Sequence, residues 1–161
     1  MTAAEYNNSV DAHSDGLFRF INKSLRDRDE SQNVVQDAFE NLWINREKVI
    51  FEKCRSWLFT TGYRKMIDHI RKQKHTISMG DNFREPVREA NHQPDIRLVI
   101  NNALSKLPEI QRSVIMLRDY EGYDYKEIGE ITGLNEAQVK VYIFRARQTM
   151  KNYIVSLEAV I

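Results

Sequence analysis

Basic and aromatic side chains recur along one side of residues 136–151 and could bind a nucleic acid. They follow each other at three- and four-residue steps, which places them on one face of a helix. They are Ala137, Lys140, Val141, Phe144, Arg145, Gln148 and Lys151. Lysine and arginine reach phosphates, and an exposed ring such as that of Phe144 can pack on a thymine methyl group. A solvated face of an ordinary helical bundle is the alternative, but it leaves the ring exposed without a partner.

The residues before this helix predict the turn that positions it. Gly129 has no Cβ and lets a second helix approach, and Gly133 can adopt the positive φ that ends a helix. Asn135 then has the side chain of an N-cap, before apolar residues resume with a 3.6-residue period. Residues 125–150 therefore predict a helix-turn-helix, in which the first turns of the second helix enter the major groove of DNA.

Two further helices carry polar faces. One spans residues 54–74 and groups Thr61, Arg64, Lys65, Asp68, Arg71 and Lys72 opposite an apolar side. Its basic end could contact a nucleic acid, but basic residues are also favourable at the C-terminus of any helix. Both interpretations stay open. The other runs through residues 30–49, with Asp29 or Ser31 as cap and Trp43 in the buried stripe. Its second face is polar and net acidic, which is typical of solvent surface, and contains Asn33, Gln36, Asp37, Glu40 and Asn41.

Composition restricts the function classes. The 161 residues carry 24 basic and 23 acidic side chains, a net charge of +1, so DNA binding would depend on local stripes and not on overall charge. A single cysteine, Cys54, and four unpaired histidines indicate neither a disulfide framework nor a metal site. The sequence has no nucleophile–base constellation and no glycine-rich phosphate loop, so we expect neither an enzyme nor a bound cofactor. It also lacks a signal peptide and a membrane-spanning apolar run, and we expect a cytoplasmic protein.

The apolar periodicity predicts an all-α fold of two small helical domains joined by a flexible linker. The first domain covers residues 1–75, and its first helix is expected to begin near Ser14 or Asp15. Residues 76–94 contain Gly80 and two prolines without a sustained period, which indicates the linker. The second domain covers residues 95–161 and adds a helix that stops at Pro108 and another over 109–120.

Three runs in this order resemble the extracytoplasmic-function (ECF) group, group 4, of the sigma-70 family of bacterial RNA polymerase sigma factors. They are DESQNVVQDAFENLW at 29–43, RSWLFTTGYRKMIDHIRK at 55–72, and LSKLPEIQRSVIMLRDYEGYDYKEIGEITGLNEAQVKVYIFRARQTMK at 104–151. The resemblance extends from about residue 17 to residue 153. It implies a protein without chemistry of its own that directs core RNA polymerase to promoters and holds the melted minus-10 strand.

The resemblance also implies roles for particular residues. Those expected to read the minus-35 element are Asn135, Ala137, Lys140, Val141, Tyr142, Phe144, Arg145 and Arg147. Those expected at the minus-10 element, beside a pocket formed by the loop 45–53, are Arg55, Thr61, Arg64, Lys65, Asp68, Arg71 and Lys72. Many members carry asparagine where Arg64 stands, and a Ser-Arg pair where Val141 and Tyr142 stand. The polar face of Asn33, Gln36, Asp37, Glu40 and Asn41 is expected to bind core polymerase.

The implied partners are promoter DNA and the largest and second-largest polymerase subunits. An inhibitory anti-sigma factor is also implied, often anchored in the membrane, whereas the chain itself is not expected to insert there. A one-component or response-regulator transcription factor would explain the helix-turn-helix equally well but leaves the first domain unexplained. A nucleic-acid enzyme is the third alternative, and the missing catalytic constellation disfavours it.

Overall fold

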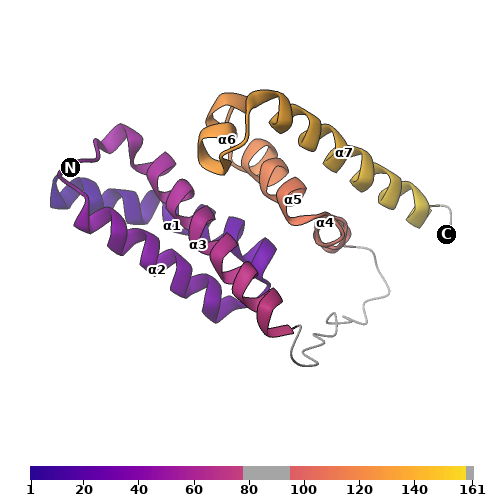
Figure 1. Cartoon of the computed structure of the whole chain (residues 1–161), viewed down its shortest axis with the longest axis horizontal. Coiled ribbons are helices and arrows are strands. Elements are labelled where there is room, and N and C mark those ends of the chain that lie inside the picture. The colour runs from indigo at the N-terminus through magenta and orange to yellow at the C-terminus, as the bar shows by residue number, and fades with distance from the viewer. Residues whose placement is uncertain (78–94, 159–161) are drawn as a thin grey trace.

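Every regular element in the computed structural model is a helix within the residues it describes, 1–77 and 95–158 (Figure 1). In chain order the elements are α1 (Ala3–Leu25), α2 (Arg28–Ile44), the 3-10 turn η1 (Phe51–Lys53), α3 (Cys54–Ile77), α4 (Ile96–Ser105), α5 (Glu109–Ile115), the π-helical segment η2 (Met116–Tyr120), α6 (Tyr125–Thr132) and α7 (Glu136–Glu158). The all-α prediction is confirmed. Apart from the last two residues of α3, the expected linker lies outside the described residues.

Helix α1 begins earlier than the sequence analysis expected. Its N-cap is Thr2, whose hydroxyl accepts a hydrogen bond from the Glu5 N–H at 3.1 Å, while Glu5 Oε1 accepts from the Thr2 N–H at 2.9 Å. This reciprocal capping box satisfies two N–H groups that a helix start leaves unpaired. The expected start near Ser14 or Asp15 was wrong, because both residues lie inside a continuous helix.

The first half is a bundle of α1, α2 and α3. The cap of α2 is Asp27, not the expected Asp29 or Ser31, and its carboxylate accepts from the Glu30 N–H at 3.1 Å. Trp43 was expected in the core but remains 37% exposed. Its ring packs edge-on against Tyr6 at a centroid distance of 4.9 Å, on the first turns of α1. The fully buried side chains of this bundle include Leu17, Phe20, Ile21, Ala38, Leu42, Leu58 and Met66.

The second half is organised by α7, which packs across α4, α5 and α6. The turn before it has the predicted geometry. Gly133 has φ +81° and its N–H donates to the Gly129 carbonyl at 2.8 Å. A Cβ on Gly129 would lie 2.7 Å from the Leu134 carbonyl oxygen, so only glycine fits where the two helices cross. The helix-turn-helix prediction is confirmed.

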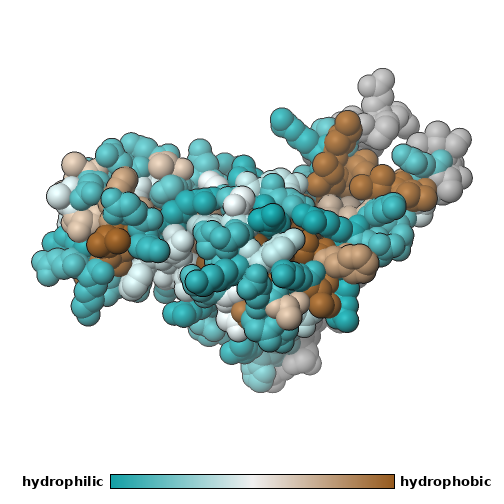
Figure 2. Space-filling model, turned by 90° about the horizontal axis from the view of Figure 1, so that it is seen from above, coloured by the Kyte–Doolittle hydropathy of each residue, from teal (hydrophilic) through white to brown (hydrophobic). Residues whose placement is uncertain are grey.

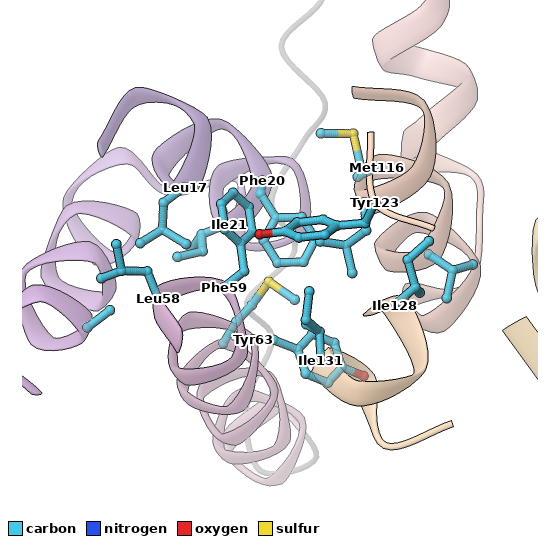
Figure 3. Packing of buried hydrophobic residues seen from close by; sticks show 14 of the residues in the cluster. Leu17, Phe20, Ile21, Leu58, Phe59, Tyr63, Met116, Tyr123, Ile128 and Ile131 are labelled. Atoms are coloured by element: carbon cyan, nitrogen blue, oxygen red, sulfur yellow. The ribbon is translucent and has the colours of Figure 1, made fainter. Parts of the chain in front are cut away.

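The two halves share one continuous hydrophobic core. Figure 3 shows Tyr123, from the segment before α6, beside Phe20 and Phe59 of the first half. The ring centroids of Tyr123 and Phe59 are 5.7 Å apart, and those of Phe59 and Phe20 are 5.6 Å apart. Helix α6 also packs against α3. We call the surface where the two halves meet the seam. Within residues 1–77 and 95–158, no helix has the length and hydropathy needed to cross a membrane.

Candidate nucleic-acid interface

The start of α7 is fixed by a second reciprocal cap. The Gln138 N–H donates to Asn135 Oδ1 at 2.8 Å, and the Asn135 N–H donates to Gln138 Oε1 at 3.0 Å. This confirms Asn135 as the N-cap and leaves the first turn of α7 at the surface, because residues 135–138 are all exposed. The turn therefore presents a rigid helix start to solvent, as a helix that enters a DNA groove requires.

The exposed face of α7 carries apolar side chains that make no contribution to the core. Phe144 is 68% exposed and Val141 is 44% exposed, whereas Ile143 between them is 2% exposed. We call the following exposed residues of this face the recognition stripe: Ala137, Lys140, Val141, Phe144, Arg145, Gln148 and Lys151. Figure 2 shows a mostly hydrophilic surface whose apolar residues gather at the end where the later turns of α7 lie. An exposed ring in a row of cations is suited to contact with base edges and phosphates.

The cations around the stripe differ in how they are held. Lys140 Nζ lies 3.9 Å from Glu136 and 5.6 Å from the Tyr125 ring centroid, which are weak surface interactions. Arg147 donates to Asp119 at 2.7 Å, and this contact raises the pKa of Arg147. Tyr142 is half-buried and Arg145 is exposed. Among the expected minus-35 residues, Lys140 and Arg145 are therefore the cations most easily turned toward a phosphate.

A cleft of about 580 Å³ opens along α3, where α6 faces it. The α3 side, which we call the α3 face, includes Thr61, Arg64 and Lys65 from the predicted minus-10 set. Lys53, the last residue of the loop expected to form the pocket, also lines the cleft, together with Ser56, Trp57 and Thr60, which the sequence analysis did not assign to it. Counted from Lys53, the cleft residues up to Arg64 recur at i, i+3, i+4, i+7, i+8 and i+11, so helical spacing could have identified them. Aromatic, hydroxyl and cationic groups side by side are what stacking on bases and binding of phosphates require.

The remaining members of the predicted minus-10 set do not line this cleft. Asp68, Arg71 and Lys72 are exposed farther along α3. Arg55 turns toward the second half, where its guanidinium donates to the Glu121 carbonyl at 2.7 Å. The structure therefore brings together only part of the expected set, and Arg55 belongs to the seam between the halves.

One residue of the polar face of α2, Asn41, lines the same cleft. Asn33, Gln36, Asp37 and Glu40 are exposed, in keeping with a surface available to a partner. Asn41 is half-buried, because its Oδ1 accepts a hydrogen bond from the Trp57 indole N–H at 2.9 Å. This hydrogen bond holds the Trp57 indole at the edge of the cleft, so Asn41 has a role within the fold.

Burial also affects ionisable groups at the seam between the halves. Desolvation raises the pKa of both Tyr63 and Tyr123 to about 12. Desolvation also raises the pKa of Glu109, a carboxyl of α5 that interacts with Ser113 and Arg112. Burial where α3 meets the second half therefore disfavours the charged form of each group.

Comparisons with known proteins match both halves. The family described as Sigma-70 region 2 matches residues 10–76, and the family described as Sigma-70, region 4 matches residues 97–150. The chain is 30% identical over 142 residues to RNA polymerase sigma factor SigV of Bacillus subtilis (strain 168), covering 86% of this chain and 84% of the relative. It is 29% identical over 140 residues to ECF RNA polymerase sigma factor SigM of the same organism, and the match covers 84% of this chain and 86% of SigM.

Two solved structures have a similar fold across both halves. The sigma factor RpoE of Bartonella quintana, solved in complex with the anti-sigma factor NepR, gives a TM-score of 0.80 at 19% identity and covers 94% of this chain and 98% of its own. CnrH, solved with the cytosolic domain of CnrY, gives a TM-score of 0.70 at 25% identity, and the match covers 94% of this chain and 88% of CnrH. With the helix-turn-helix and the matches to both sigma regions, the chain belongs to the ECF group of sigma-70 RNA polymerase sigma factors, which direct promoter-specific transcription.

Proposed function

We propose that this chain binds core RNA polymerase and selects promoters by two separate DNA contacts, one to duplex and one to melted DNA. The observation that carries the proposal is the recognition stripe, in which Phe144 remains 68% exposed between Lys140 and Arg145. A ring left in water on a well-capped helix gains free energy when a partner covers it. The fold itself does not use this ring.

Duplex reading at the minus-35 element would use α7. The early turns, with Ala137, Lys140 and Val141, would enter the major groove, where side chains meet base edges. The later residues Arg145 and Arg147 would contact phosphates and set the register without reading sequence. Arg147 would have to exchange its ion pair with Asp119 for a phosphate.

Capture of the minus-10 strand would use the α3 face. Unpairing and flipping a base costs a few kcal/mol, which stacking and hydrogen bonding in the pocket must offset. Trp57 at the edge of the cleft offers an aromatic surface, while Arg64 and Lys65 offer cations for the backbone. A protein that binds only the separated strand shifts the equilibrium toward melted DNA without hydrolysing ATP.

The protein partners follow from the exposed polar face of α2 and from the family. Asn33, Gln36, Asp37 and Glu40 would bind the largest subunit of core polymerase, and the second half would lie near the second-largest subunit. RpoE and CnrH were each solved with NepR or CnrY bound, and we extend an inhibitory anti-sigma partner, membrane-anchored or free, to this chain. We place the protein in the cytoplasm, where the polymerase acts.

Transcription by reconstituted holoenzyme tests the proposal. The purified chain is mixed with bacterial core polymerase and used for run-off transcription on a library of random promoters, with core alone as the control. We expect retention of the chain on immobilised core and enrichment of promoters that share two spaced elements. A chain that neither binds core nor confers promoter choice would contradict the proposal.

Two variants separate its parts. Asp37→Arg reverses a charge on the exposed α2 face and should abolish core binding while the fold is retained, since Asp37 has no role in the hydrophobic core. Lys140→Ala with Arg145→Ala should leave core binding intact and abolish transcription from promoters that need the minus-35 element. If the double variant lost core binding instead, the assignment of α7 to DNA would be wrong.

A further inference from the structure

A second cavity, of about 460 Å³, lies where the end of α1 and the start of α2 meet α4, and we call it the α1–α4 cavity. It shares no lining residue with the recognition stripe, the α3 face or the polar face of α2. The residues that line it are Asn22, Lys23, Arg26, Arg28, Asn101, Asn102, Leu104 and Ser105. Three of them are cations, four carry an amide or a hydroxyl group, and none of these described residues is acidic.

Arg26 occupies a backbone position that would suit glycine better. Its φ is +52°, the only positive φ of a non-glycine residue among the described residues. Its N–H donates to the Asn22 carbonyl at 2.9 Å and ends α1. A helix that ends in the left-handed conformation usually takes glycine there, because a Cβ makes that conformation costly. An arginine kept in such a place, with its side chain on the cavity, points to a use for the guanidinium.

The cations of the cavity are crowded by other cations. Burial, and then the charge of Arg19, lower the pKa of Lys23. Burial, and then the charge of Arg26, lower the pKa of Arg112, which donates to the carbonyl of the lining residue Leu104 at 3.0 Å. An anion placed in the cavity would favour the charged form of Lys23 and reduce this repulsion.

Two amides of the cavity are oriented to donate hydrogen bonds. Asn22 Oδ1 accepts from the buried Ser31 hydroxyl at 3.1 Å, and Asn101 Oδ1 accepts from Lys23 Nζ. Because each amide oxygen already has a donor, each amide offers its NH₂ group to a ligand. Cations combined with N–H donors bind the oxygens of phosphate groups. The Lys23–Asn101 hydrogen bond also joins α1 to α4, so both halves of the chain build the cavity.

The lining favours a compact phosphate ligand over other anions. None of the described lining residues is aromatic, so a nucleobase would find no ring on which to stack. The one apolar residue, Leu104, is only 1% exposed and offers little surface to a lipid chain. The three cations come from the single segment 23–28, whereas a nucleic-acid strand requires cations in a row along a groove. Their charge matches a ligand with two or more phosphate groups, and the volume is typical of small-molecule sites.

We propose that the α1–α4 cavity binds a small oligophosphate, either inorganic di- or triphosphate or the phosphate tail of a nucleotide whose base stays in solvent. Lys23, Arg26 and Arg28 would neutralise the phosphates, while Asn22 and Asn101 would donate to their oxygens. The ligand would therefore contact both halves of the chain. This site goes beyond the promoter function and uses none of the residues assigned to DNA or to core polymerase.

Two substitutions remove cations at positions where the backbone favours the new residue. Arg26→Gly places glycine at a positive φ, and Arg28→Glu puts an acidic side chain in the first turn of α2. Asn101→Asp keeps an oxygen for Lys23 but replaces an N–H donor of α4 with a negative charge. Lys126→Glu is the matched control for Arg28→Glu, because Lys126 is exposed in the first turn of α6 and does not line the cavity. Thermal unfolding of each free variant checks the fold, and we expect Arg26→Gly to be at least as stable as the wild type.

Isothermal titration calorimetry at fixed ionic strength measures binding to the free full-length chain. The probes are inorganic triphosphate, ATP, inorganic phosphate and a short single-stranded DNA oligonucleotide. We expect triphosphate and ATP to bind with similar affinity and the other two probes to bind much more weakly. Arg26→Gly, Arg28→Glu and Asn101→Asp should each weaken triphosphate binding about tenfold, whereas Lys126→Glu should match the wild type. Triphosphate at about 100 times its Kd should raise the Tm of the wild type by roughly 5–10 °C.

Each other result would overturn a stated part of the proposal. A wild-type chain that does not bind triphosphate has no such site, and equal weakening by Lys126→Glu would reduce the effect to overall charge. ATP binding much tighter than triphosphate binding would show that the base is recognised. An oligonucleotide that binds more tightly than triphosphate, and is released by Arg26→Gly, would make the cavity part of a nucleic-acid path. Unchanged affinity in Asn101→Asp would remove α4 from the site. These measurements use neither core polymerase nor a promoter, so failure of the site is distinct from failure of the proposed function.

Discussion

Two neighbouring residues of α7 allow the role of the recognition stripe to be separated from the stability of the fold. Ile143 is 2% exposed and lies in the core, whereas Phe144 is 68% exposed on the opposite face. Truncating each to alanine removes an apolar side chain from the same helix turn. We expect Ile143→Ala to unfold the second half and Phe144→Ala to leave its stability almost unchanged but to reduce promoter use.

The magnitudes follow from the burial of each side chain. A fully buried isoleucine cut to alanine typically costs about 2–5 kcal/mol, through lost transfer free energy and the cavity that remains. Phe144 has only about a third of its surface covered, so its truncation loses about 0.5–1 kcal/mol of burial. The higher helix propensity of alanine returns a few tenths of a kcal/mol. A lost base contact costs about 1–3 kcal/mol, which corresponds to roughly a 5- to 150-fold loss in promoter affinity.

Thermal unfolding followed by circular dichroism measures the first quantity, and run-off transcription with core polymerase on a minus-35-dependent promoter measures the second. The informative result is a crossed pattern, in which Phe144→Ala has a near wild-type Tm and weak transcription. If Phe144→Ala lowered Tm as much as Ile143→Ala, the ring would belong to the fold. Full transcription by Phe144→Ala would show that the exposed ring does not read the promoter.

Three further predictions concern the helix crossing, the seam and the cleft. Gly129→Ala would place a Cβ 2.7 Å from the Leu134 carbonyl oxygen, and we expect a loss of about 1–3 kcal/mol and a Tm lowered by on the order of 5 °C; an unchanged Tm would contradict this crossing. Burial raises the pKa of Tyr63 and Tyr123 to about 12 from the usual 10, so the stability of the neutral phenols is present below pH 10 and lost as pH rises toward 12. Ultraviolet titration should therefore show a late tyrosine step that coincides with loss of near-ultraviolet dichroism, and a single step near pH 10 would oppose it. Arg64→Asn should change the minus-10 sequences selected from a promoter library while leaving the minus-35 sequences as they were, and a shift in both would place Arg64 outside the pocket.

The sequence predicted those features that depend on residues close together in the chain. Gly129, Gly133 and Asn135 were each predicted with the role that the structure gives them, because a helix crossing, a positive φ and a cap are satisfied within a few residues. The alternation of buried Ile143 and exposed Phe144 also followed from helical periodicity alone. The division into two helical halves was visible in the same way.

The errors have two sources: an environment supplied by a distant segment, and a local helix cap that apolar periodicity does not reveal. Trp43 was predicted to be buried but stays 37% exposed, with Tyr6 from the first turns of α1 against its ring. The earlier start of α1 at Thr2 and Glu5 was missed because most of the next ten residues are polar, although the capping pair was present in the sequence. Sequence periodicity finds which side of a helix is apolar, but not which other helix reaches it.

Arg55 illustrates the boundary between the two kinds of information. Its place on a polar, basic helix was evident from the sequence, and a role at DNA followed from the resemblance. Only the folded chain brings it to Glu121, 66 residues away, and turns it into the seam between the halves. Helices, caps and turns are encoded by neighbouring residues through backbone hydrogen bonds and side-chain period. The pairing of Arg55 with Glu121 depends on how the surfaces of the two folded halves meet. The spacing of residues along the sequence does not specify that contact.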